Sequence, residues 1–150
     1  MQFIPDWAPN IHPLIIHFPI ALLLVAVFID AVSIWFQKGW LYKSALSTYL
    51  FGTLGAIAAY FTGRIAADTV SPSFNAELTM SNHSDWGLYT VVFFSIYTLL
   101  RLIFIKKINP ENKLIRLASL VVAIAGLYLL LRTGDLGGKL VFKYGVGQFN

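Results

Sequence analysis

Four long apolar stretches, separated by short polar ones, follow one another along this chain. The first, Pro13 to Phe36, is interrupted only by His17, Asp30 and Ser33. A helix rises about 1.5 Å per residue, so about 20 apolar residues cross the hydrocarbon core of a bilayer. The pattern predicts an all-α polytopic membrane protein, a single domain over residues 1–150 that forms an antiparallel bundle of four transmembrane helices, with spans at about 13–36, 45–66, 86–105 and 114–131.

The composition supports a membrane protein. Hydrophobic residues make up 57% of the chain and charged residues only 12%, whereas soluble domains carry about one quarter charged residues. The formal net charge of +4 does not indicate nucleic acid, because the lysines and arginines are dispersed at helix ends rather than clustered on one face. We therefore expect the lipid bilayer as the main partner.

The segments between the spans predict the turns. Residues 37–44 form a predicted turn in which Trp35, Trp40 and Tyr42 suit the membrane interface. Residues 67–82 read as a polar loop, after which the sequence from Asn82 to Asp85 resembles a helix start. From Arg132 onwards the chain predicts a glycine-rich tail that leaves the bilayer.

The distribution of basic residues predicts the orientation. The turns after the first and third spans, with their flanking helix ends, hold seven of the eleven lysines and arginines: Lys38, Lys43, Arg101, Lys106, Lys107, Lys113 and Arg116. Because cytoplasmic loops carry the excess of lysine and arginine, both termini and the tail are expected on the extracytoplasmic side. The first ten residues lack the basic region of a signal peptide, so we expect the first helix to remain in the mature protein.

Two polar features inside the spans predict contacts between helices. Asp30 and Arg101 lie at matching depth in the first and third spans, and each alone in hydrocarbon would be costly, so we predict that they form an ion pair. A row of small residues, Gly52, Gly55, Ala59 and Gly63, follows one face of the second span. This row allows close approach of another helix or of a flat ligand.

The histidines are the candidate site. The chain has no cysteine, which leaves histidine and carboxylate as possible ligands of a metal or a haem iron. An ionisable side chain inside a span normally faces other protein or a cofactor, so we expect His17 to face inward, towards His83 at the start of the third span. His12 and His17 lie about 140° apart on a regular helix, so they cannot both face one small ion unless the helix begins after His12.

At its two ends the chain carries recognisable motifs. HPLIIHFPIALL (His12 to Leu23), the glycine-bearing second span, the histidine opening the third span and TGDLGGKLVFKYGVG (Thr133 to Gly147) together resemble the DUF2231 family of small four-helix bacterial membrane proteins. The resemblance covers nearly the whole chain. It implies the same four-helix fold and a place in the bacterial inner membrane.

The resemblance also bears on function. Some members of the family are joined to or encoded with cytochrome-type domains, which suggests respiratory redox work. Members usually carry a further histidine in the last motif, where this chain has Tyr144. The departure leaves His12, His17 and His83 as candidate ligands, with the tail expected to lie as a lid across the bundle and to hold Tyr144 over a cofactor.

Several functions remain open from the sequence. The first is a b-type haem electron-transfer subunit with His17 and His83 as ligands, His12 as the substitute, and Arg64 and Arg132 near the haem propionates. The others are a copper or zinc site on the three histidines, a cofactor-free subunit that packs against a larger respiratory or photosynthetic complex or a cytochrome partner, and a transporter or proton path. The sequence holds no hydrolase triad, phosphate loop or paired-carboxylate motif, so we expect no stand-alone enzyme.

Overall fold

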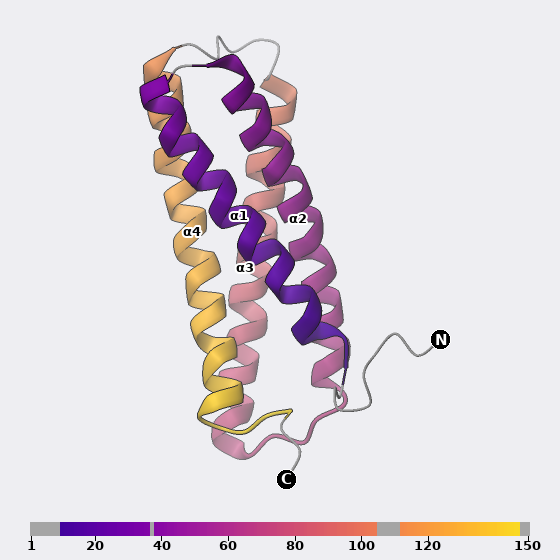
Figure 1. The fold of residues 1–150 in the computed structure, drawn as a ribbon. Coiled ribbons are helices and arrows are strands. Elements are labelled where there is room, and N and C mark those ends of the chain that lie inside the picture. The colour runs from indigo at the N-terminus through magenta and orange to yellow at the C-terminus, as the bar shows by residue number, and fades with distance from the viewer. Residues whose placement is uncertain (1–9, 37, 105–111, 148–150) are drawn as a thin grey trace, which may run out of the picture.

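The computed structural model describes residues 10–36, 38–104 and 112–147, which form four long helices in an antiparallel bundle (Figure 1). All four are long and apolar enough to cross a membrane. The protein is therefore a multi-pass membrane protein, and the prediction of an all-α four-helix bundle is confirmed. The helices are α1 (His12–Phe36), α2 (Gly39–Ala67), α3 (Phe74–Phe104) and α4 (Lys113–Phe142).

The helices form a ring in which each one packs against two neighbours. Helix α1 contacts α2 and α4, and α3 contacts the same two helices, so α1 and α3 lie diagonally across the bundle. Figure 1 shows α1 crossing the bundle obliquely, beside α4 where α1 ends and over α2 where α1 begins. We call the end with His12 and His83 the histidine end, and the opposite end, with Arg101 and Arg116, the arginine end.

Close contact between α1 and α2 depends on the small-residue row of α2. A Cβ atom at Gly52 would lie 2.8 Å from Leu23 Cδ2, and one at Gly55 would lie 3.3 Å from Pro19 Cδ. Both distances are too short for ordinary packing, so a side chain at either position would push the helices apart. At Gly52 and Gly55 the small-residue row therefore allows close approach of another helix, one of the two possibilities that the sequence left open.

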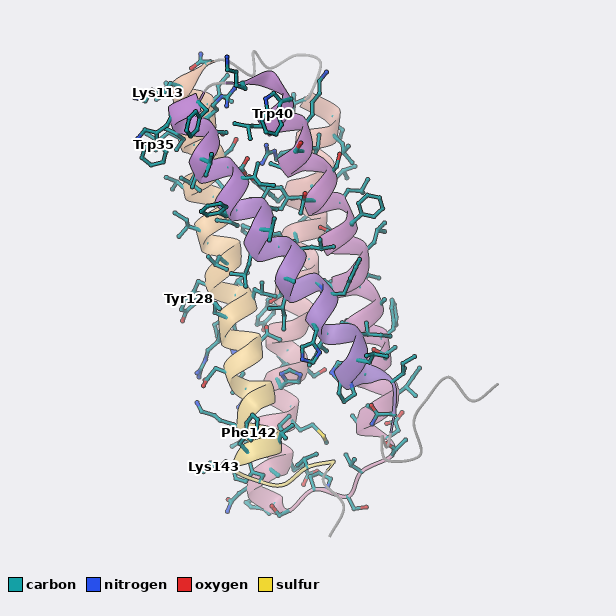
Figure 2. All side chains as sticks on the ribbon, in the orientation of Figure 1. Trp35, Trp40, Lys113, Tyr128, Phe142 and Lys143 are labelled. Atoms are coloured by element: carbon teal, nitrogen blue, oxygen red, sulfur yellow. The ribbon has the colours of Figure 1, made fainter. Side chains whose placement is uncertain are left out.

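The bundle has a narrow core and an apolar outer surface. Tyr49 and Phe94 are fully buried and their rings stack with centroids 6.2 Å apart, near the middle of the bundle. Most large apolar side chains project outward, as a lipid-facing surface requires (Figure 2). Trp35 and Trp40 are exposed at the arginine end, as predicted for interfacial residues, but Tyr42 is buried and the prediction of its place at the interface is wrong.

The connections at both ends are shorter than the sequence predicted. Helix α2 begins at Gly39, and only residues 68–73 separate α2 from α3. The predicted loop over residues 67–82 is therefore wrong, and Asn82 to Asp85 lie within α3 rather than at its start. The physical reason is that α3 extends beyond the apolar span, where water solvates polar side chains on a helix as readily as on a loop. The predicted basic turn at 106–113 lies mostly outside the described residues.

Helix α4 also continues beyond its predicted end. Residues 132–142 are helical, so the predicted start of the tail at Arg132 is wrong and the glycine-rich tail begins only after Phe142. Ion pairs from Asp135 to Arg132 and to Lys139, each 2.7 Å long, join successive turns of this segment and offset the helix-weakening effect of its glycines. The chain then turns at Gly145, whose φ of 65° suits glycine.

At the arginine end, a buried polar cluster joins all four helices. Asp30 Oδ2 accepts hydrogen bonds from Arg101 Nη1 at 2.5 Å and from Tyr49 Oη at 3.0 Å, so the predicted ion pair is confirmed. Tyr97 Oη donates to the Ser119 carbonyl of α4 at 3.0 Å. Arg101 and Asp30 are only 5% and 3% exposed, so water screens their attraction weakly.

We predict that removing the charge of Asp30 destabilises the bundle. Asp30→Asn leaves the Arg101 guanidinium buried without its counterion, and breaking a buried pair in this way costs about 3–5 kcal/mol of unfolding free energy. Reversible unfolding in mixed micelles, followed by tryptophan fluorescence, measures the loss. Asp135→Asn is the matched control, because both of its ion pairs are exposed and we expect little change. Equal effects of the two variants would contradict the prediction.

Candidate functional site at the histidine end

His12 is the first residue of α1, and its ring lies directly over α2. A Cβ atom at Gly63 would lie 2.9 Å from His12 Cε1, so only glycine leaves room for the imidazole at this point. Nδ1 lies 3.2 Å from Thr62 Oγ1. The Thr62 hydroxyl also lies 3.0 and 3.1 Å from the carbonyl oxygens of Ala58 and Ala59, and either Nδ1 or the hydroxyl can donate in the bond between His12 and Thr62.

His83 has the corresponding arrangement on the other side of the bundle. It lies in α3, and its ring packs over Gly137 of α4, where a Cβ atom would be 3.1 Å from His83 Cε1. His83 Nδ1 donates to the backbone carbonyl of Thr133 at 3.0 Å. A carbonyl oxygen can only accept, so the neutral His83 ring is protonated on Nδ1 and keeps the lone pair on Nε2.

The two imidazoles lie at the same end of the bundle, and we call them the histidine pair. They come from the diagonal helices α1 and α3, and both are partly buried. Each ring uses Nδ1 for a hydrogen bond to a neighbouring helix, to Thr62 and to Thr133. Each keeps Nε2 as the nitrogen that could hold a ligand.

His17 does not join this pair. The prediction that it faces inward is wrong, because its side chain is exposed on the outer surface of α1. Helix α1 already begins at His12, so the two histidines point about 140° apart. The contact of His12 with Gly63 fixes the rotation of α1, and this rotation turns His17 away from His83.

The two predicted arginines lie at the same end but on the surface. Arg64 is exposed and its Nη1 lies 3.4 Å from Ser84 Oγ. Arg132 pairs with Asp135 at 2.7 Å, and its guanidinium lies 5.8 Å from the centre of the Trp86 ring. Both cations thus flank the histidine pair without touching it.

Tyr144 packs against the first turns of α3. It hydrogen-bonds with Thr79 and shares a surface depression with Phe74 and Asn75. Figure 1 shows the chain after α4 passing across the end of the bundle towards the start of α3. The hydrogen bond with Thr79 and the nearby charge of Lys143 lower the pKa of Tyr144. The predicted position of Tyr144 over a cofactor stays a prediction.

Sequence reasoning missed the partners that hold the histidines. Thr62, Thr133 and Gly137 have no chemistry of their own that distinguishes them from other small residues in a membrane helix. The available signal was spacing, because His83 to Thr133 and His12 to Thr62 are both separations of 50 residues. This equal spacing can be interpreted only when it is known which helices are neighbours in the bundle.

A family model, described as a predicted membrane protein (DUF2231), matches residues 8–150. The chain belongs to the DUF2231 family. The resemblance drawn from the terminal motifs is thereby confirmed. No curated protein and no solved structure matches this DUF2231 protein.

We predict that His83 in this DUF2231 protein is the Nδ1–H tautomer when neutral. The reason is the hydrogen bond from Nδ1 to the Thr133 carbonyl, which a ring protonated on Nε2 could not make. Nitrogen NMR of protein labelled at histidine distinguishes the two tautomers by the shifts of the ring nitrogens. His83→Gln assigns the signal, and exposed His17 is the internal control, for which we expect a mixture of tautomers. An Nε2–H form of His83 would contradict the assignment.

Proposed function

We propose that this protein binds a b-type haem through His12 and His83 and works as a small electron-transfer subunit of the membrane. The observation that carries the proposal is the pair of imidazoles on diagonal helices, each fixed through Nδ1 and each keeping Nε2 for a ligand. Helix bundles hold cofactors in this way, between side chains of facing helices. The pair replaces the assignment of His17 as a ligand.

The number of donors favours haem over a mononuclear metal site. A haem iron already has four nitrogen ligands from its ring, so two axial histidines complete its coordination. Zinc and copper sites usually take three or four protein ligands. Within residues 10–36, 38–104 and 112–147, no group of three or more histidine, cysteine, aspartate or glutamate side chains could hold a metal ion.

The surroundings of the two histidines also suit a haem ligand. The Thr133 carbonyl accepts the Nδ1 proton of His83, and such an outer hydrogen bond orients a ligand ring and raises its basicity. Gly63 and Gly137 give each ring its place against the next helix. Arg64 and Arg132 supply cations at the same end, where propionate groups need them. When bound, a haem supplies one-electron transfer, and the protein residues hold it and set its electrostatics.

The same proposal includes a place in the cell. The excess of lysine and arginine around the arginine end would put that end in the cytoplasm of a bacterium and the histidine end at the outer face of the inner membrane. The electron partner would then be a cytochrome or a subunit of a respiratory complex that reaches the outer leaflet.

The test is the absorption spectrum of protein produced with sufficient haem. We expect a Soret band and reduced-form visible bands at about one haem per chain, both lost in His12→Ala and His83→Ala. His17→Ala is the matched control, because it removes an exposed imidazole from the same helix and should leave the spectrum unchanged. Loss of the bands in His17→Ala alone, or protein that stays colourless after titration with haemin, would overturn the proposal.

A second candidate function rests on His17 itself. An exposed imidazole about five residues inside a span is costly against lipid, which favours a face covered by another membrane protein. In this case the chain is a cofactor-free accessory subunit of a larger respiratory or photosynthetic complex. For such a subunit we expect a colourless protein that co-migrates with the complex in mild detergent. His17→Leu should weaken the co-migration. Phe28→Leu, at another exposed position of α1, should leave it unchanged. Equal weakening by both would count against it.

A further inference from the structure

The guanidinium of Arg101 is only partly engaged by the residues that the structure describes. Its Nη1 donates to Asp30 Oδ2 and to Tyr97 Oη, at 2.5 and 3.1 Å. Nε and Nη2 are buried and have no hydrogen-bond partner within residues 10–36, 38–104 and 112–147. The side chain is 5% exposed, so bulk water does not satisfy these donors. Unpaired donors of a buried cation are costly, which indicates that a further group completes the site.

The geometry of the unused donors selects the chemistry of that group. Nε and Nη2 form one edge of the planar guanidinium, and this edge binds two oxygen atoms of a carboxylate or phosphate side by side. The rings of Tyr42, Tyr49 and Tyr97 lie 4.5, 5.2 and 5.6 Å from the guanidinium carbon and occupy its surroundings. The pair with Asp30 already engages Nη1. The unused donors lie in the plane of the group, which is the direction from which an oxyanion binds a guanidinium.

The position of Arg101 explains how an oxyanion could reach it. Arg101 lies one turn before the end of α3, and Tyr42 lies in the first turn of α2. The start of α2, at Lys38, has no side-chain cap, so its first backbone N–H groups add a positive dipole at this end. Exposed Lys38 and Lys43 stand at the same boundary. Positive charge thus gathers at the start of α2, the helix whose Tyr42 ring packs against Arg101.

We propose that the Nε–Nη2 edge of Arg101 is a binding site for one phosphate-type oxyanion. Two sources share this chemistry: the headgroup of an anionic phospholipid at the membrane surface, and free phosphate from the aqueous side. The site lies at the opposite end of the bundle from the histidine pair, so its existence does not depend on haem binding.

The full chain in phosphatidylcholine nanodiscs provides the test, with thermal unfolding as the measurement. One series adds inorganic phosphate, with sodium chloride at equal ionic strength as the control. The other replaces part of the lipid by phosphatidylglycerol in phosphate-free buffer. We expect a saturable rise in Tm of about 4 °C at about ten times the Kd. A rise with phosphate alone identifies a free oxyanion, and a rise with phosphatidylglycerol alone identifies the lipid headgroup.

Two variants separate this site from general attraction of anions. Arg101→Lys keeps the charge beside Asp30 but lacks the two-donor edge, so the rise should be lost. Lys113→Gln removes an exposed cation at the start of α4, at the same end, and should keep the rise. No rise in either series, or the same rise in Arg101→Lys, overturns the proposal. If Arg101→Lys does not fold, native mass spectrometry of the wild type decides: one retained phosphate or phosphatidylglycerol per chain supports the site, and none refutes it.

Discussion

The buried ion pair between Asp30 and Arg101 is the interaction on which the bundle depends. It links α1 to α3, which lie diagonally and have no backbone contact in the described part of the chain. Tyr49 brings in α2, and Tyr97 ties the cluster to α4 through a backbone carbonyl. In lipid the hydrophobic effect does not press helices together, so polar contacts and close packing must do so. One carboxylate therefore fixes the relative positions of four helices.

The two ends of the bundle are held together differently. The arginine end is held by a buried ion pair, whereas at the histidine end each imidazole bonds a neighbouring helix through Nδ1. The small residues matter as much as the histidines there, because Gly63 and Gly137 admit the rings between the helices. Rigid packing in the middle, around Phe94, keeps the two ends independent.

The sequence predicted the spans and the ion pair because both follow from how deep a residue lies, and depth can be counted along a chain. It could not predict which face of α1 points inward, because that rotation depends on a contact between His12 and a glycine of α2. It also placed Tyr42 at the interface, where tyrosine is common, although the Arg101 guanidinium provides a buried surface for its ring. Polar residues from 74 to 82 read as a loop because polarity alone does not separate a solvated helix from a turn.

The separation of Asp30 from Arg101 along the chain, 71 residues, affects biogenesis. A ribosome releases the first hairpin before the third helix, so the carboxylate enters the translocon without its counterion. Until α3 arrives, Asp30 has no counterion, and an unpaired carboxylate is costly in hydrocarbon. The pair that stabilises the finished protein therefore forms late, and the first hairpin must be inserted without it.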